Sequence, residues 1–215
     1  MNCIITAGPT YEPLDEVRRL TNFSTGRLGT ELANFLVARG HQVILLLSVQ
    51  ATYAGERRAQ QVELFTTSSN LREKLQALSP QTVNAVFHTA AVGDFRFGRI
   101  QLKSPHGKLT EVKSKKIPTT EGTLLVELLP TQKIIAELRA WFPSARLVGW
   151  KFEADGKRPE AIRSAQQQLT RCLTDACVAN GPAYGEGFGL ITRGRQVHLA
   201  DPPKLFDALE KLVLT

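Results

Sequence analysis

The stretch Thr6–Gly29, TAGPTYEPLDEVRRLTNFSTGRLG, decides the fold of this chain. The apolar run Cys3–Ile5 leads into it and the amphipathic segment Leu28–Arg39 leads out, so it joins a buried strand to a helix. A compact domain rarely keeps so long a connection unless the loop has a function. We therefore expect an acyl-phosphate-type reaction centre here. Its central residue is Asn22, because a neutral amide can donate to a developing oxyanion. A turn-forming role for Asn22 is the simpler alternative.

Outward from this stretch, buried-strand patterns alternate with helical ones. Strands are expected at Cys3–Thr6, Val43–Leu47, Val62–Phe65, Val83–His88, Arg146–Trp150 and Asp175–Ala179, followed by a hairpin of Gly187–Ile191 and Gln196–Leu199. Helices are expected at Leu28–Arg39, after a cap at Ser68, Ser69 or Asn70, around Ile134–Trp141, from Pro159 with Ile162, Leu169 and Leu173 on the apolar face, and after Asp201. This order predicts an α/β fold, Rossmann-like and doubly wound, with a mostly parallel sheet.

The segment from about residue 95 to 130 interrupts this rhythm. It has no convincing helical pattern, and its extended pieces, Arg99–Leu102 and Leu124–Leu129, flank a basic turn. We interpret it as a β-flap that projects from the main sheet. No linker or repeat is visible, so residues 1–215 are predicted to form a single domain with this flap as a subregion.

Composition narrows the class of partner. The net charge of +7 suits an anionic small substrate such as a polyphosphate. Nucleic acid is disfavoured because aromatic residues are not interleaved with the basic ones. The three cysteines form no CxxC motif and are expected to be reduced thiols, with a catalytic Cys172 as the less favoured alternative. No signal peptide and no apolar run near ~20 residues is found, so we expect a cytoplasmic protein without a membrane partner.

In a doubly wound fold, ligands bind at the carboxyl ends of the strands. The loops after Thr6, at Ala90–Asp94, at Gly149–Glu153 and after Asn180 all belong to that edge. Neither a G-x-G-x-x-G nor a P-loop motif is present, which disfavours a conventional NAD(P) site. The four histidines lack metal-ligand spacing, so no metal site and only structural or surface roles are expected for them. Backbone amides at Ser24–Gly26 could bind a phosphate, and a plain N-cap is the simpler alternative.

Five blocks together carry a family resemblance. They are TAGPT-x-EP-x-D-x-VR-x-x-TNFSTG-x-x-G, AAVGDF, KSKK, LVGWKFE and DACVAN, spread over residues 3 to about 190. The chain resembles phosphopantothenoylcysteine synthetase, also called phosphopantothenate–cysteine ligase. The first block is highly specific for that family, whereas AAVGD and VGWKFE are weak alone.

The resemblance implies a ligase of coenzyme A biosynthesis. Such an enzyme activates the carboxylate of 4′-phosphopantothenate as an acyl-nucleotidylate, releases pyrophosphate, and then forms an amide with cysteine. It implies CTP, in preference to ATP, as co-substrate, with Mg²⁺ and in a homodimer. The flavin-dependent decarboxylase half found in many bacterial relatives has no room in 215 residues, so a stand-alone ligase without flavin is expected.

The same resemblance implies roles for individual residues. The catalytic set is Asn22 with Lys116 or Lys115, and the acid substrate is expected at Thr10 and Asn22. The nucleotide is expected at Gly8, Ser24, Thr25, Gly26, Ala90, Ala91, Asp94, Lys113 and Trp150. Lysines can stabilise the charge of departing pyrophosphate. In an extended flap Lys113 and Lys115 would share a face and Lys116 would take the other. A solvated basic edge is the simpler alternative for this run.

The chain departs from the family pattern at the helix before DACVAN. Gln168 and Cys172 stand where lysines commonly grip the nucleotide, and Trp150 stands where phenylalanine is more usual. Three nearby cations could compensate for the missing lysines, namely Lys151, Arg163 and Arg171. Arginine and lysine are not interchangeable in such a role, however. Two alternatives follow, a nucleotide sensor or inactive relative on the same fold and, less favoured, an NAD(P)-dependent oxidoreductase.

Overall fold

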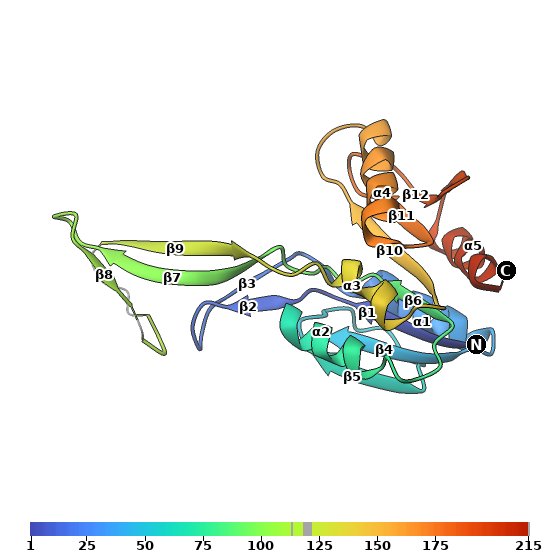
Figure 1. Ribbon diagram of the computed structural model, residues 1–215, viewed down its shortest axis with the longest axis horizontal. Helices are drawn as coiled ribbons and strands as arrows, with labels where there is room; N and C mark the ends of the chain where they lie inside the picture. The colour runs from blue at the N-terminus through green and yellow to red at the C-terminus, as the bar shows by residue number, and fades with distance from the viewer. Residues whose placement is uncertain (113, 118–121, 215) are drawn as a thin grey trace.

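The structure is a computed structural model that describes residues 1–112, 114–117 and 122–214 (Figure 1). Its centre is an eight-stranded sheet with the order β13-β12-β11-β10-β6-β1-β4-β5. The strands of this sheet are β1 (Asn2–Ala7), β4 (Gln42–Ser48), β5 (Gln61–Phe65), β6 (Ala85–His88), β10 (Arg146–Phe152), β11 (Ala176–Asn180), β12 (Phe188–Thr192) and β13 (Gln196–Leu199). The helices are α1 (Arg27–Ala38), α2 (Ser68–Ala77), α3 (Ile134–Trp141), α4 (Arg158–Cys172) and α5 (Pro202–Leu214).

The sheet is parallel except at one edge. Strands β5, β4, β1, β6, β10 and β11 run parallel, and the β12–β13 hairpin is antiparallel. From β1 the chain proceeds through β4 and β5 to one side, and from β6 it proceeds through β10 and β11 to the other. The order therefore reverses between β1 and β6, where doubly wound folds bind ligands. The predicted α/β doubly wound fold is confirmed.

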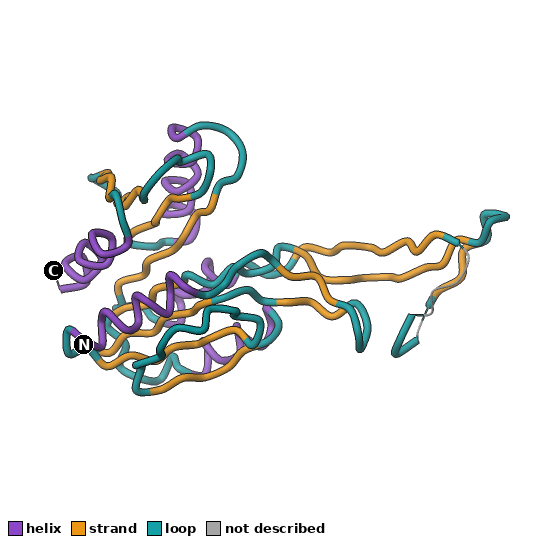
Figure 2. Tube along the Cα trace, turned by 180° about the vertical axis from the view of Figure 1, so that it is seen from behind, coloured by secondary structure: helices purple, strands orange, loops and turns teal. Residues whose placement is uncertain are grey.

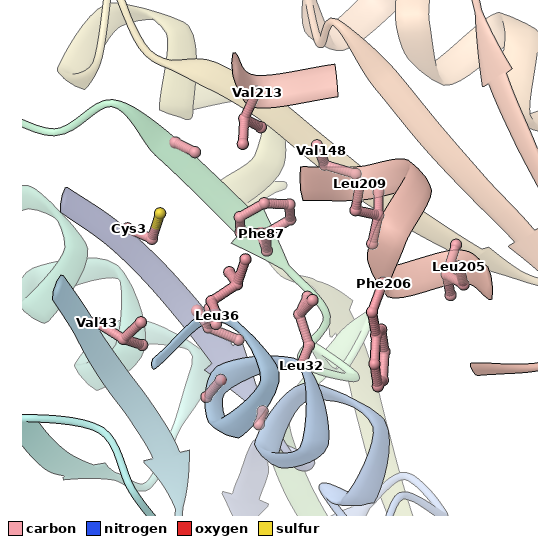
Figure 3. Packing of buried hydrophobic residues seen from close by; sticks show 14 of the residues in the cluster. Cys3, Leu32, Leu36, Val43, Phe87, Val148, Leu205, Phe206, Leu209 and Val213 are labelled. Atoms are coloured by element: carbon pink, nitrogen blue, oxygen red, sulfur yellow. The ribbon is translucent and has the colours of Figure 1, made fainter. Parts of the chain in front are cut away.

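Helices cover both faces of the sheet. Alternation along β10 shows the two faces, because Leu147 packs in the core with α2 and α3 while Val148 packs with α1 and α5. The α1–α5 side is seen in Figure 3, where Leu32 and Leu36 of α1 and Leu209 of α5 close over Phe87. Helix α4 buries Ala161, Ala165 and Leu169 against β11 on the α2–α3 side. Burial of these apolar side chains supplies most of the stability of such a core.

The predicted β-flap is present as a separate sheet. It contains β7 (Phe95–Lys103), β8 (Leu109–Glu111) and β9 (Thr123–Pro130) in the order β8-β7-β9. Both views show it extending far from the α/β core (Figures 1 and 2). Several large apolar side chains of the flap are exposed in the single chain, namely Phe95, Leu109, Leu125 and Leu128. The single chain therefore leaves apolar side chains of the flap partly in solvent.

The opening stretch folds differently from a simple loop. Its strands β2 (Tyr11–Pro13) and β3 (Arg19–Thr21) form a two-stranded antiparallel hairpin. Helix α1 has Gly26 at its N-cap, with φ +78°, so neither Ser24 nor Thr25 occupies the N-cap position, although the Thr25 hydroxyl accepts from the Arg27 N–H (3.3 Å). Helix α2 is capped by the Thr67 hydroxyl, which accepts from the Asn70 N–H, and not by the residues expected.

One further expectation was wrong at the end of α4. Leu173 was expected on the apolar face of this helix, but it ends the helix in a left-handed conformation and is half exposed. None of the helices in the described residues combines the length and apolar character that a membrane span requires.

Candidate active site

Two loops meet at the carboxyl edge where the strand order reverses. The Thr10 N–H donates to the Ala91 carbonyl (3.1 Å), and the Ala91 N–H donates to the Gly8 carbonyl (3.1 Å). The buried Thr10 hydroxyl also accepts from the Gly93 N–H (2.8 Å). The loop after β1 and the loop after β6 are therefore joined into one rim. Thr10 and Ala91 hold this rim together through hydrogen bonds within the protein.

Asn22 lies on the same rim, directly after β3. Its side-chain Nδ2 donates to the carbonyl oxygens of Val92 (3.2 Å) and Ala91 (3.4 Å). These contacts tie the amide to the loop after β6, although Asn22 itself is exposed. The next residue, Phe23, is fully exposed. The amide is accessible and its orientation is fixed, and donation from Nδ2 to a reacting group would replace one of these two carbonyl contacts.

A cavity of about 450 Å³ opens beside this rim, between α3 and α4. We call it the α3–α4 cavity. Its volume falls in the range of small-ligand sites, roughly 300–1,000 Å³. Its walls come from the loop after β6, the start of α3, the end of β10 and α4; among them are Ala90, Val92, Asp94, Lys133, Ile135, Trp150, Lys151, Gln168, Arg171 and Cys172. Ala90, Asp94 and Trp150 are thus brought together as predicted, and Gln168 and Cys172 face the same space.

The charge of this cavity is mainly positive. Lys133, Lys151 and Arg171 line it, against the single carboxylate Asp94. Lys133 and Asp94 form an ion pair at its mouth, with both side chains well exposed. Cys172 shares the wall, and partial burial raises the pKa of its thiol despite these cations. The cavity can therefore attract a polyphosphate although α4 carries no lysine in this wall.

The side chain of His88, at the carboxyl end of β6, lines the α3–α4 cavity. His88 on β6 lies in register with Thr6 on β1 and with Gly149 on β10, which in turn pairs with Cys177 on β11. The Gln168 amide lies over Gly149, because a Cβ at Gly149 would come within 2.0 Å of Gln168 Nε2. Burial lowers the pKa of His88 to about 4, so its imidazole is neutral at pH 7.

A second hollow, of about 390 Å³, lies at the start of α1. We call it the α1 hollow. Gly8, Ser24, Thr25 and Gly26 line it, together with Thr89. Backbone amides at the start of a helix make a good anion site. Because α1 and α3 cover opposite faces of the sheet, the residues predicted to bind the nucleotide divide between the two hollows. Asn22 lies between the two hollows. It contacts Val92, which lines the α3–α4 cavity, and it precedes by two residues Ser24, which lines the α1 hollow.

Trp150 has contacts on both sides of the sheet. It contributes to the wall of the α3–α4 cavity, but its alternation along β10 places its ring against the α1–α5 core with Val148 and Phe87. Its indole Nε1 is buried, and none of the described residues accepts its hydrogen bond. Trp150 thus reaches the wall of the α3–α4 cavity with a partly buried ring, and its contact with a nucleotide stays a prediction.

The lysine run is held by the tip of the β2–β3 hairpin. The Asp15 carboxylate accepts from the guanidinium of Arg18 (2.5 Å) and from the backbone N–H of Ile117 (3.1 Å). Arg18 also donates to the Ile117 carbonyl (2.6 Å), and the Glu16 N–H donates to the Lys115 carbonyl (2.9 Å). The Arg18 hydrogen bond, with backbone N–H donors, holds the pKa of Asp15 well below its usual range. Ser114–Ile117 is thus a docked loop.

This docking changes the expected geometry of the lysines. Lys115 and Lys116 lie in a bend and not in a strand, so the predicted alternation of faces is wrong for them. Lys115 lies 3.6 Å from the Glu16 carboxylate, and both side chains are largely exposed. Lys113 lies outside the described residues. Neither Lys115 nor Lys116 lines the α3–α4 cavity or the α1 hollow.

Two residues of this site were missed or undervalued in the sequence. Lys133 stands alone at the N-cap of α3, and no motif marks it. Lys133 lies three residues after β9. A prediction that paired the first and last strands of the flap would have placed it beside the loop after β6. His88 was expected to be structural, although its place at the carboxyl end of a switch-point strand was itself a signal.

Comparison with known proteins now identifies the family. The family described as DNA/pantothenate metabolism flavoprotein, C-terminal domain, matches residues 1–212. The chain belongs to this family. The bifunctional protein CoaBC of coenzyme A biosynthesis from Thermococcus kodakarensis is 32% identical over 221 residues, covering 98% of this chain and 51% of that protein. The chain thus spans about half the length of this curated relative.

Solved structures show that the fold is the one this family adopts. The DNA/pantothenate metabolism flavoprotein from Streptococcus pneumoniae superposes with a TM-score of 0.86 at 21% identity, covering 100% of this chain and 98% of that one. A Cab2 mutant, H337A, in complex with phosphopantothenate-cysteine superposes with a TM-score of 0.71 at 20% identity, covering 99% and 87%. At these identities the likeness concerns the fold alone.

Proposed function

We propose that this chain is a phosphopantothenate–cysteine ligase. It would activate the carboxylate of 4′-phosphopantothenate with a nucleoside triphosphate and then join it to the amine of cysteine. The observation that carries the proposal is the position of Asn22 on a rim between two hollows that both suit phosphate-bearing ligands. The family match to a domain of pantothenate metabolism, and the likeness to a structure solved with phosphopantothenate-cysteine, support the choice of substrates.

The α3–α4 cavity would take the nucleotide. Its volume, its three cations and its partly apolar wall suit a base, a sugar and a triphosphate in one space. CTP is the nucleotide we favour over ATP on the family resemblance. The triphosphate would lie toward Lys133, and the Lys133–Asp94 pair would open to admit it.

The α1 hollow would take the phosphate of 4′-phosphopantothenate. It has backbone amides from Ser24 to Arg27 at the start of α1, and the helix dipole adds positive potential there. Arg27 lines the same end, where its guanidinium is paired with the carboxylate of Glu31 (2.7 Å). With the phosphate there, the pantothenate chain would cross the rim near Asn22 and bring its carboxylate toward the nucleotide.

The chemistry would proceed in two balanced steps. A carboxylate oxygen attacks the α-phosphorus, and pyrophosphate leaves with its bond to that phosphorus broken. The cysteine amine then attacks the acyl carbon and loses a proton, and the nucleoside monophosphate leaves. Asn22 would donate to the oxyanion of the second step, where a neutral donor carries no competing charge. Lys115 or Lys116 would balance the charge on the departing pyrophosphate.

Mg²⁺ would arrive with the triphosphate. No group of three or more His, Cys, Asp or Glu side chains that could hold a metal exists within the described residues. Asp94, at the cavity mouth, is the carboxylate available to a nucleotide-bound ion. Phosphate oxygens and water would supply its remaining ligands, as is usual for Mg²⁺.

A homodimer would complete the site. Arg18, which holds the lysine loop, lies four residues before Asn22 along an extended strand, roughly 13 Å away. That separation favours delivery of Lys115 or Lys116 to the site of a second copy. Exposed apolar side chains on the flap and near the rim, including Phe23 and Val17, suit coverage by that copy. The free, buried thiols of this chain, Cys3 and Cys177, fit a protein of the reducing cytoplasm.

One assay tests the function. The protein is incubated with 4′-phosphopantothenate, cysteine, Mg²⁺ and each of CTP, ATP, UTP and GTP, and pyrophosphate release is measured with each component omitted in turn. We expect release that needs the acid and the nucleotide, and amide product that also needs cysteine. Nucleotide binding without any release would instead indicate a sensor, as the missing α4 lysines at Gln168 and Cys172 would allow.

A further inference from the structure

An apolar groove of about 660 Å³ lies at the antiparallel edge of the central sheet, between the β12–β13 hairpin and α5. We call it the β13–α5 groove. Its apolar lining comes from both elements, namely Leu190, Val197, Leu199, Ala208 and Leu212. Among the described residues, none lines both this groove and the α3–α4 cavity or the α1 hollow. Both views show the hairpin and α5 at the end of the molecule opposite to the flap (Figures 1 and 2). The groove is therefore separate from the candidate active site.

The groove exists because α5 covers only part of the hairpin. Helix α5 buries one apolar stripe in the core that it shares with α1, namely Leu205, Leu209 and Val213. Its flank, with Ala208 and Leu212, is only partly buried. Beyond this flank, Val197 and Leu199 of β13 are also only partly buried, and α5 alone among the described helices lines the groove. The hairpin thus keeps an apolar face that can accept side chains from outside.

The outer side of β13 pairs with no strand of the described residues. Strand β13 ends the eight-stranded sheet, and its neighbour there is β12. The Thr192 N–H donates to the Arg195 carbonyl (2.8 Å), which makes these two residues a hydrogen-bonded pair. Bonded and non-bonded pairs alternate along an antiparallel ladder, so Gln196 and His198 direct their N–H and C=O groups away from β12. Such a row of unpaired backbone groups is a template for an added strand.

Strand β13 lacks the features that usually block strand addition. Natural edge strands often carry lysine, proline or a bulge, whereas β13 reads Gln-Val-His-Leu and keeps a regular register with β12. Side chains alternate along it, so Val197 and Leu199 line the groove. His198 points to the other face, where its Nδ1 lies 3.1 Å from the Tyr184 hydroxyl. A strand added to β13 therefore places every second side chain on the side of the groove.

The rim of the β13–α5 groove is positively charged. It carries one carboxylate, Asp207, and three cations, namely Arg195, Lys204 and Lys211. Asp207 is already paired with the Arg39 guanidinium (2.7 Å). Lys204 forms an exposed pair with Asp201 at 3.4 Å, and such pairs contribute little. Within the described residues, the other two cations form no ion pair. A ligand of complementary charge is therefore acidic.

We propose that the β13–α5 groove binds an extended acidic peptide of a partner protein, which adds to β13 as a further strand. Its backbone pairs with Gln196 and His198, its apolar side chains enter the groove at alternate positions, and its flanking carboxylates meet the cations of the rim. A second copy of this chain is a poorer occupant, because two-fold pairing of β13 brings two sets of the same cations together. An anionic lipid matches the cations but leaves the backbone edge unpaired. The proposal does not depend on the proposed ligase function.

Titration with a synthetic peptide tests the proposal. The probe is a fluorescein-labelled peptide in which valine alternates with threonine between paired glutamates at each end, and a scrambled peptide of the same composition breaks the alternation. Binding to the full chain is measured by fluorescence anisotropy. We expect the alternating peptide to bind about tenfold more tightly or better, and binding to weaken as salt rises, because the rim charges are exposed. Hydrogen exchange should slow at the Gln196 and His198 amides, which the added strand engages.

Two variants separate the backbone contribution from the charge contribution. Gln196→Pro removes an outward N–H and keeps the ladder with β12, because proline is tolerated on the open side of an edge strand. Lys211→Glu reverses one exposed charge of the rim, and Lys108→Glu makes the same change at an exposed position of the flap. We expect the first two variants to weaken binding by about tenfold, and Lys108→Glu to keep the wild-type affinity. Thermal unfolding of each variant checks that it is folded.

Absence of peptide binding would overturn the proposal, as would equal affinity for the alternating and scrambled peptides or unchanged affinity in Gln196→Pro. Two further results would overturn it by assigning another occupant to the groove. Binding of the chain to vesicles of anionic lipid that persists in Gln196→Pro and is lost in Lys211→Glu would indicate a lipid surface. An assembly of copies that is lost in Gln196→Pro would indicate a second copy of the chain.

Discussion

The carboxylate of Asp15 accepts a hydrogen bond of 3.1 Å from the backbone N–H of Ile117, 102 positions later in the chain. Asp15 belongs to the hairpin that ends at Asn22, and Ile117 directly follows the lysine run. Ile117 is also buried, so a polar and an apolar contact fix the same point. The proposed catalytic amide and the proposed catalytic lysines are therefore held by one structural unit, the β2–β3 hairpin.

Asp15→Asn should loosen the lysine loop without disturbing the nucleotide cavity. An amide cannot accept from Arg18 and Ile117 as a carboxylate does. We expect kcat/KM to fall by about tenfold or more, since small misplacements of catalytic groups are costly. Hydrogen exchange at Ile117 should accelerate, while the dissociation constant for CTP stays unchanged. Asp155→Asn is the matched control, because it makes the same change at an exposed carboxylate away from the lysine loop. Equal effects of the two substitutions would contradict a role for the Asp15–Ile117 contact.

Asn22→Asp should separate the two proposed chemical steps. A carboxylate at this position repels the oxyanion of the amide-forming step. The attack on the α-phosphorus does not depend on a donor at position 22. We expect the acyl-nucleotidylate to accumulate in a quench experiment, with amide formation reduced by about 100-fold. Asn22→Ala should show a smaller loss, because it removes the donor without adding charge. Normal turnover by the aspartate variant would remove Asn22 from the mechanism.

Lys133→Gln should weaken binding of the triphosphate. Lys133 is a cation at the mouth of the α3–α4 cavity, where it pairs with Asp94. A charge-assisted hydrogen bond contributes about 1.5–3 kcal/mol, so we expect KM for the nucleotide to rise by about ten- to 100-fold. The loss should shrink at high salt, because exposed charges are screened. Lys204→Gln, at the exposed start of α5, is the control and should leave KM unchanged.

His88 should make the folded state sensitive to mild acid. Burial lowers its pKa to about 4, against an ordinary value near 6.5, so the folded state binds the proton more weakly than the unfolded state. This contribution to stability is complete above about pH 6.5 and is lost as the pH falls toward 4. The free energy of unfolding falls by about 3 kcal/mol over this pH range. Urea unfolding at several pH values should show this loss in the wild type and in the exposed control His106→Gln, and a smaller one in His88→Phe.

The order of strands and helices followed from the sequence because each carries a long apolar pattern. Cys3–Thr6 and Val43–Leu47 are apolar on both faces, as buried parallel strands must be, and the flap was visible as a break in the alternation. The β2–β3 hairpin was not predicted. Its strands have three residues each and β3 is fully exposed, so no alternation marks them.

The site was predicted in part, and the missing part depends on the third dimension. Asp94 and Trp150 were expected near one another, and both reach the α3–α4 cavity. Gly8 and Gly26 were assigned to the same nucleotide as Asp94 and Trp150, and this stays a prediction. The structure places them at the α1 hollow, on the other face of the sheet, and sequence spacing cannot tell the two faces apart. Lys133 was missed for the same reason. Its neighbour Asp94 lies 39 positions away and reaches it only because β7 and β9 pair.

The fate of the carboxylate oxygens tests the central claim most directly. 4′-Phosphopantothenate carrying ¹⁸O in its carboxylate is turned over with cysteine, Mg²⁺ and CTP, and the products are analysed by mass spectrometry. Activation as an acyl-nucleotidylate predicts one ¹⁸O in the nucleoside monophosphate, none in pyrophosphate, and one retained in the amide. Label in orthophosphate, or a monophosphate free of ¹⁸O while the amide forms, would contradict it.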